Sequence, residues 1–171
     1  MSSSPLSPSR LSRYVATEQG VYGLILVSGL IASAGGLGAS AGRVLLFVAV
    51  TVIVFWLAHV YASVVAGHGR WDAAGKPKPL GVTIRESVRE ARGMLISSVF
   101  PMLALFLGVL GLLPDPASFW LALWTSVAAL ACLGYLSYRR LGASTPARLV
   151  GAVATASFGL VIILAKVLVS H

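Results

Sequence analysis

The fold is decided by the stretch from Val44 to Gly69, which reads VLLFVAVTVIVFWLAHVYASVVAGHG and contains no Asp, Glu, Lys or Arg. A helix needs about 20 consecutive apolar residues to cross the hydrocarbon core of a bilayer, and this stretch is long enough. Residues 44–50 are apolar without interruption, whereas a transmembrane β-strand alternates apolar and polar residues. The stretch therefore predicts a membrane-spanning α-helix.

Four other long apolar stretches accompany it, and together the five predict an all-α, polytopic integral membrane protein. Charged residues make up only 11% of the 171 positions, against about 25% in soluble domains. The five predicted spans cover about 19–41, 44–67, 93–113, 116–138 and 147–169. Residues 11–171 are therefore expected to form one five-helix transmembrane domain. Residues 1–10 are rich in Ser and Pro, which predicts a disordered tail.

The basic residues predict the orientation of the spans. Eleven of the 13 Lys and Arg residues fall on one side: Arg10, Arg13, Arg70, Lys76, Lys78, Arg85, Arg89, Arg92, Arg139, Arg140 and Arg148. Because positive residues stay in the cytoplasm, we expect a cytoplasmic N-terminus and an external C-terminus. Arg43 and Lys166 lie on the other side, and Lys166 is interpreted as an interfacial anchor.

The net charge of +8 follows from this topology, and no nucleic-acid-binding motif accompanies it. The expected partners are the bilayer itself and anionic lipid headgroups at the cytoplasmic face. A composition rich in Ala, Val, Gly and Arg favours a bacterial cytoplasmic membrane. Ala39-Ser40-Ala41 is similar to a signal-peptide cleavage site, but the preceding apolar stretch is long, which favours a retained first span.

Residues 82–92 have the pattern of an amphipathic cytoplasmic helix, with apolar residues at helical spacing beside three arginines. This helix either lies on the headgroups or extends the third span inward. On the external side, Pro114-Asp115-Pro116 predicts a tight turn in which Asp115 caps the fourth span.

Ionisable residues inside spans are candidates for function because burying them in a membrane is costly. Glu18 and His59 are expected at similar depth in neighbouring antiparallel spans, with Tyr22 and Tyr61 as hydroxyl partners. A histidine beside a carboxylate can exchange protons near neutral pH. The alternative is that Glu18 lies among the headgroups and His59 is a neutral core histidine.

Small residues at positions 151, 155 and 159 form a packing ridge on the fifth span, made of Gly151, Thr155 and Gly159. Such ridges let helices approach closely. The ridge is expected to pack within the bundle, with homo-oligomerisation or a partner membrane subunit as the alternative.

The sequence contains no metal-site, cofactor or catalytic motif that we can identify, and Cys132 is its only cysteine, so no metal or cofactor is predicted and an enzyme is not favoured. The preferred interpretation is a small-solute or ion permeation component, with proton coupling through His59 and Glu18 as one form of it. A non-catalytic membrane subunit or assembly partner is the alternative. A lipid-modifying membrane enzyme is a further one.

Overall fold

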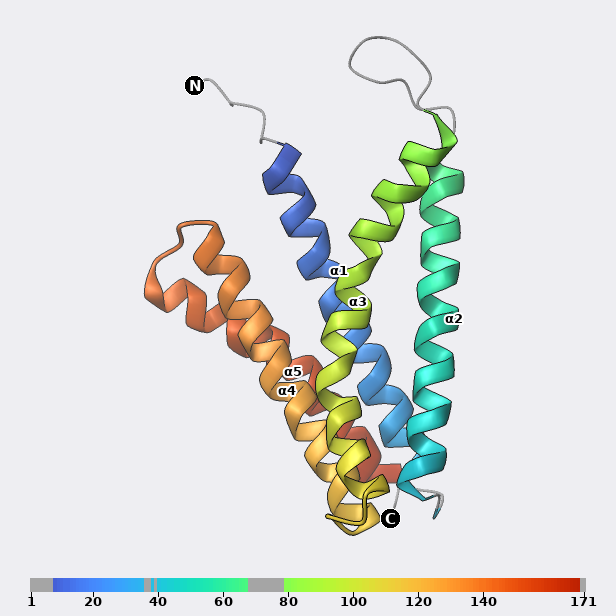
Figure 1. Cartoon of the computed structure of the whole chain (residues 1–171). Coiled ribbons are helices and arrows are strands. Elements are labelled where there is room, and N and C mark those ends of the chain that lie inside the picture. The colour runs from blue at the N-terminus through green and yellow to red at the C-terminus, as the bar shows by residue number, and fades with distance from the viewer. Residues whose placement is uncertain (1–7, 36–37, 39, 68–78, 170–171) are drawn as a thin grey trace.

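The computed structural model describes residues 8–35, 38, 40–67 and 79–169, and this part of the chain forms five α-helices and no β-strand (Figure 1). They are α1 (Pro8–Ala34), α2 (Ala41–Gly67), α3 (Leu80–Val109), α4 (Asp115–Arg140) and α5 (Thr145–Val169). Four of them, α2 to α5, are long and apolar enough to cross a membrane. In α1 the apolar stretch among the residues whose side chains are described is Glu18–Ala34. The all-helical class is therefore confirmed.

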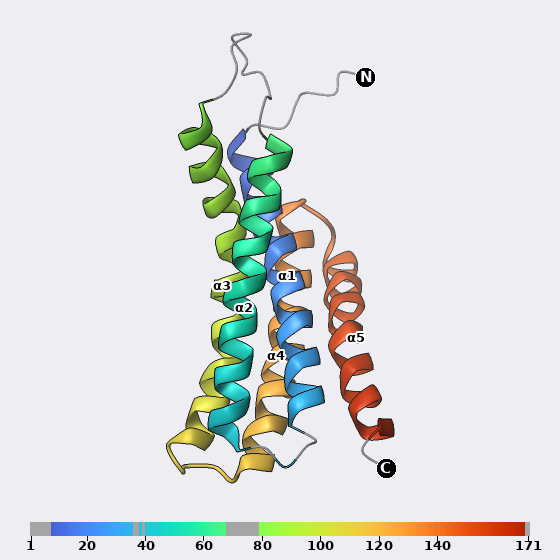
Figure 2. The ribbon, with the colours of Figure 1, turned by 90° about the vertical axis from the view of Figure 1, so that its right-hand side faces the viewer.

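The centre of the bundle is α3, which packs against α1, α2 and α4, whereas α5 packs mainly on α4. Figure 2 shows α5 at the edge of the bundle, with α1, α2 and α3 grouped together. Figure 1 shows α4 and α5 leaning away from the other three helices toward the end at which α1 begins. The bundle is thus tightly packed at one end and spread at the other.

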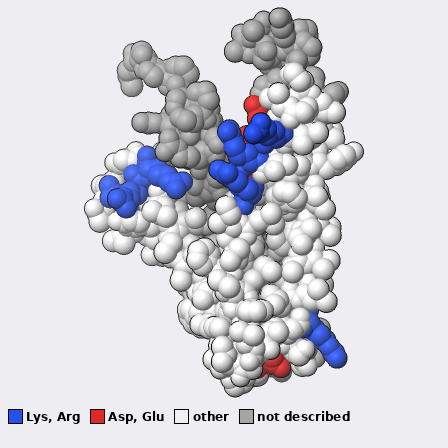
Figure 3. Space-filling model, in the orientation of Figure 1, with Lys and Arg blue, Asp and Glu red and all other residues white. Residues whose placement is uncertain are grey.

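The two ends of the bundle also differ in charge. The spread end, which we call the basic end, carries these arginines among the described side chains: Arg85, Arg89, Arg92, Arg139, Arg140 and Arg148. The opposite end, which we call the Asp115 end, includes Arg43 and Asp115. Figure 3 shows the arginines gathered at the basic end and a broad uncharged zone between the two ends.

The apolar core lies in the half of the bundle nearest the Asp115 end. Its buried members come from the last turns of α1, the first half of α2, the end of α3 and the start of α4. They are Val27, Ile31, Ala41, Val44, Val48, Val52, Ala104, Leu105, Phe119, Ala122 and Leu123. Burial of this set holds the four helices together at this end.

Residues 82–92 belong to α3, so the amphipathic segment and the third apolar stretch form one continuous helix. Pro101 lies within this helix and is buried. The face of 82–92 that carries Arg85 and Arg89 is exposed, whereas Thr83 and Ser87 are buried. This part of α3 therefore contributes a polar face to the bundle interior.

The predicted role of Asp115 as the cap of its own helix is wrong. Pro114 occupies the N-cap position of α4 without a side-chain hydrogen bond, and the Asp115 carboxylate instead accepts a 2.9 Å hydrogen bond from the backbone N–H of Ala41. The first N–H groups of α2 need partners from outside the helix. In α4, Pro116 has no backbone N–H and therefore needs no hydrogen-bond partner. Asp115 therefore caps α2 and ties it to α4.

Removing this contact should weaken the Asp115 end. Asp115→Ala is expected to lower the free energy of unfolding by about 1 kcal/mol, the usual worth of a helix cap. Asp115→Asn keeps an acceptor oxygen and should lose less. Thermal unfolding of the purified protein in detergent measures both variants, and an alanine variant as stable as the wild type would contradict the capping role.

The ridge on α5 faces α4 of the same chain. Gly151 lies against the ring of Tyr138, and a Cβ on Gly159 would lie 2.8 Å from Cγ2 of Val127. Thr155 donates a hydrogen bond to the carbonyl of Gly151 and lies against Gly134 of α4. The small residues thus allow α4 and α5 to pack in direct contact.

Lys166 lies near the Asp115 end of α5, and its side chain turns toward α4. The ammonium nitrogen is 5.6 Å from the ring centres of both Phe119 and Trp120. A cation held over aromatic faces gains a favourable electrostatic interaction. Lys166 therefore links the last turns of α5 to the first turns of α4.

Candidate polar site between α1, α2 and α3

The register of the antiparallel pair α2 and α3 is fixed by a close contact at each end. At the basic end, a Cβ on Gly67 would lie 2.8 Å from Cγ2 of Thr83. At the Asp115 end, a Cβ on Gly108 would lie 2.8 Å from Cβ of Ala41. The level of any residue on one helix can therefore be matched to a residue on the other.

This register places His59 at the level of Glu90. His59 follows Ala41 by 18 residues, and Glu90 precedes Gly108 by 18 residues. At a rise of about 1.5 Å per residue, both lie about 27 Å from the Ala41–Gly108 contact. His59 follows buried Val52 by seven residues, which is two turns, so the two side chains lie on the same face of α2. His59 itself is half-buried. An imidazole and a carboxylate thus share one level of the α2–α3 pair.

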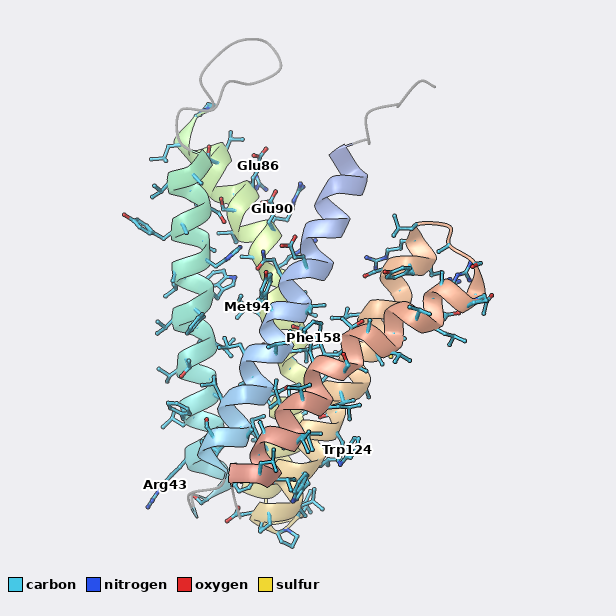
Figure 4. All side chains as sticks on the ribbon, turned by 180° about the vertical axis from the view of Figure 1, so that it is seen from behind. Arg43, Glu86, Glu90, Met94, Trp124 and Phe158 are labelled. Atoms are coloured by element: carbon cyan, nitrogen blue, oxygen red, sulfur yellow. The ribbon has the colours of Figure 1, made fainter. Side chains whose placement is uncertain are left out.

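A pocket of about 240 Å³ opens between α2 and α3 at the basic end, and most of its lining is polar. Ser63 of α2 and Glu86, Ser87 and Glu90 of α3 contribute to its wall, together with Thr83. Figure 4 shows Glu86 and Glu90 one above the other on α3, with Met94 further along the helix. Polar groups therefore extend from the basic end to the level of His59.

The third helix of the site is α1, which runs parallel to α3. A Cβ on Gly23 would lie 3.0 Å from Cα of Met94, so these residues share a level. Gln19 precedes Gly23 by four residues, just as Glu90 precedes Met94 by four. Glu18 and Gln19 therefore lie at the level of Glu90, and so at the level of His59.

Two polar atoms near this level are buried without a hydrogen-bond partner among the described residues. They are Oε1 of Gln19 and Nε1 of Trp56. Gln19 is only 6% exposed, and a buried polar group left unpaired costs about 1–3 kcal/mol. Such groups call for a physical explanation, of which a bound polar ligand or water is one. Near the level of His59, Gln19 thus provides an unpaired hydrogen-bond acceptor and Trp56 an unpaired donor.

The four residues predicted from sequence differ in their exposure and in their contacts. Glu18 is exposed and His59 is half-buried, and the described part of the chain shows no hydrogen bond or ion pair between them. Tyr22 and Tyr61 are 59% and 72% exposed, so they lie on the outer faces of α1 and α2. Within the described residues, no group of three His, Cys, Asp or Glu side chains is arranged to hold a metal ion.

Sequence reasoning missed Gln19, Trp56 and Glu90. Glu90 had a readable signal, because Glu86 and Glu90 are spaced four apart and so lie on one face of a helix, beside a separate arginine face. The signal for Gln19 and Trp56 is weaker, since an amide and an indole are ordinary near a membrane interface. Their burial becomes clear only from the packing of the helices.

Comparison with known proteins gives no family for this chain: no protein-family model, curated protein or solved structure matches it. The structure nevertheless supports a class. Four helices long and apolar enough to cross a membrane, within an all-helical bundle, fit a multi-pass membrane protein.

Proposed function

We propose that the protein is a small-solute or ion permeation component of a membrane, linked to protons through His59, Glu18 and Glu90. The observation that carries the proposal is the shared level of His59 and Glu90 on the adjacent helices α2 and α3, with Glu18 at a similar level on the exposed face of α1. Ionisable groups within membrane helices mark ion and substrate paths in many proteins. Histidine is the side chain that gains and loses protons near neutral pH.

The two halves of the bundle suggest how such a path would be organised. The polar pocket of Ser63, Glu86 and Glu90 opens toward the basic end, so a proton or small cation would enter there. Beyond the level of His59, the described interior contains the apolar core around Val48 and Leu105, and buried serines there such as Ser98 donate to carbonyls of their own helices. This half would act as the barrier, and movement of the helices would be needed to complete the path.

We also propose that α1 is the fifth span and that the basic end faces the cytoplasm. A helix of the length of α1, 27 residues, extends about 40 Å, more than the thickness of a hydrocarbon core. The concentration of arginines at the basic end supports the orientation through the positive-inside rule. The bacterial cytoplasmic membrane remains the proposed location.

Reconstitution into liposomes tests this function. With a pH-sensitive dye inside the liposomes, the wild-type protein should dissipate an imposed proton gradient, and His59→Ala should slow this flux by at least about tenfold because a proton-transfer group is lost. Tyr61→Phe is the control, since this side chain is 72% exposed on the same helix and its change should leave the flux unaltered.

Two outcomes would count against the proposal. Wild-type flux no greater than that of empty liposomes, under proton gradients and under gradients of common ions, would remove the permeation function and favour a non-catalytic membrane subunit. Equal flux in the wild type and His59→Ala would remove the histidine from the path.

A further inference from the structure

A second cavity, of about 670 Å³, opens between α1, α3 and α4 at the basic end. Its walls are largely apolar: Ile96 and Phe100 line it from α3, and Leu133 and Leu136 line it from α4. Gly20 and Leu24 of α1 also contribute to its lining. Figure 1 shows α4 leaning away from α3 toward this end. The volume lies within the range of known small-molecule pockets, about 300–1,000 Å³.

The charged residues of this cleft are placed at one end of it. Arg92 of α3 and Arg140 of α4 both line the cleft and are both exposed. Arg92 precedes Phe100 by eight residues, and Arg140 follows Leu133 by seven, so the apolar wall continues about 10–12 Å beyond the two guanidinium-bearing positions. The cleft therefore combines a cationic mouth with an apolar interior.

We infer that this cleft binds an anionic phospholipid, with its phosphate between Arg92 and Arg140 and an acyl chain along the wall formed by Ile96, Phe100, Leu133 and Leu136. A guanidinium is planar and pairs with phosphate through two parallel hydrogen bonds. Basic pockets between membrane helices on the cytoplasmic side suit anionic headgroups. A soluble phosphate compound would leave the apolar wall unfilled, so the lipid is the occupant that matches both parts.

The inference does not rest on the proposed permeation function, because the lipid cleft carries its arginines on α3 and α4, whereas His59 and Glu90 share a level on α2 and α3 and line no part of this cleft. Gly93 and Ser97 leave room on the cleft face of α3, and Ala128 and Ala129 leave room on α4. Elsewhere in the bundle, small residues bring α4 and α5 into direct contact. In the cleft they line an open space instead.

Cys132 makes the inference testable without adding a probe site, because it is the only cysteine of the chain, is exposed and lines the cleft. The full-length protein is purified in an uncharged detergent, and the rate of Cys132 alkylation by a maleimide is measured as lipid is added. Phosphatidylglycerol should slow alkylation at a lower mole fraction than phosphatidylcholine with identical acyl chains. Glycerol 3-phosphate, which has the phosphate but no chain, should not slow it.

Substitution of both arginines tests the cationic mouth. The double variant Arg92→Gln/Arg140→Gln should need at least about tenfold more phosphatidylglycerol for half-protection, because two charge-assisted contacts are lost. The matched control is Arg85→Gln/Arg89→Gln, which removes the same charge from the exposed face of α3 outside the cleft, and it should behave as the wild type does.

The comparison of phosphatidylglycerol with phosphatidylcholine uses the wild-type protein and needs no substitution. Equal protection by the two lipids, or protection by glycerol 3-phosphate, would overturn the inference. An equal loss of protection in the two double variants would also overturn it, because net charge rather than the cleft would then explain the preference.

Discussion

Replacing Gly134 with alanine is expected to destabilise the protein more than any other single-methyl change at the helix contacts described above. A Cβ at this position would overlap Oγ1 of Thr155 and the backbone carbonyl of Gly151 on α5. The carbonyl carbon of Gly151 would lie only 2.9 Å away. Backbone atoms cannot rotate out of the way as the end of a flexible side chain can, so α5 must move.

The cost of this change is expected to be about 1–3 kcal/mol, the usual range for an overpacked interior. Membrane helices associate mainly through close packing, and α5 packs mainly on α4. A shift of α5 therefore loses most of its contacts. The variant should unfold at a lower temperature in detergent and should expose α5 to proteolysis before the other helices.

Gly29→Ala is the matched control for Gly134→Ala. Both changes add one methyl group within a membrane helix, but a Cβ on Gly29 would meet nothing within 4 Å. Replacing glycine by alanine in an open helical position should stabilise the protein by about 0.5–1 kcal/mol. If Gly134→Ala proved as stable as Gly29→Ala, the close packing of α4 on α5 would be contradicted.

The helices of this protein could be predicted from sequence because a long apolar stretch is itself the signal for a membrane-spanning helix. The stretch from Val44 to Gly69, for example, predicted the helix that the structure has as α2, from Ala41 to Gly67. The small residues on α5 also carried a local signal for close approach. Which helix they approach depends on the packing of the whole bundle. The sequence therefore left open whether the partner was a second chain or a neighbouring helix.

The role of Asp115 shows the same limit at a single residue. Its place before Pro116 favoured a cap on α4, since local sequence shows only the helix that follows. The N–H group that Asp115 binds belongs to Ala41, 74 positions away in the chain. No local pattern reports such a contact, because it arises when α2, α3 and α4 meet at the Asp115 end.

From sequence, the depth of a site residue along its helix could be predicted, but the direction in which its side chain points around the helix axis could not. Counting residues from the ends of the spans was enough to propose that Glu18 and His59 share a level. Counting could not show that Tyr22 and Tyr61 face outward, because a small rotation of a helix moves a side chain from the interior to the lipid. Glu90 can be assigned to the level of His59 only from the Gly67–Thr83 and Gly108–Ala41 contacts, which define the register of α2 and α3.

Glu90→Gln is expected to have the largest effect on function. The change keeps the size of the side chain and removes its ability to exchange a proton, so proton flux in liposomes should fall by about 10²-fold or more, as for other proton-transfer groups. Glu90 is half-buried and lines the polar pocket at the level of His59. The control is Asp115→Asn, the same change from carboxylate to amide at the opposite end of the bundle, and it should leave the flux near the wild-type value.

The double variant His59→Ala/Glu90→Gln then decides whether the two residues act together. Groups that serve one step are strongly non-additive, because the first substitution already removes what the second would remove. The double variant should therefore conduct protons about as slowly as the slower of the two single variants. If the two losses multiplied instead, His59 and Glu90 would act at separate steps, and the shared level on α2 and α3 would not be the site of proton exchange.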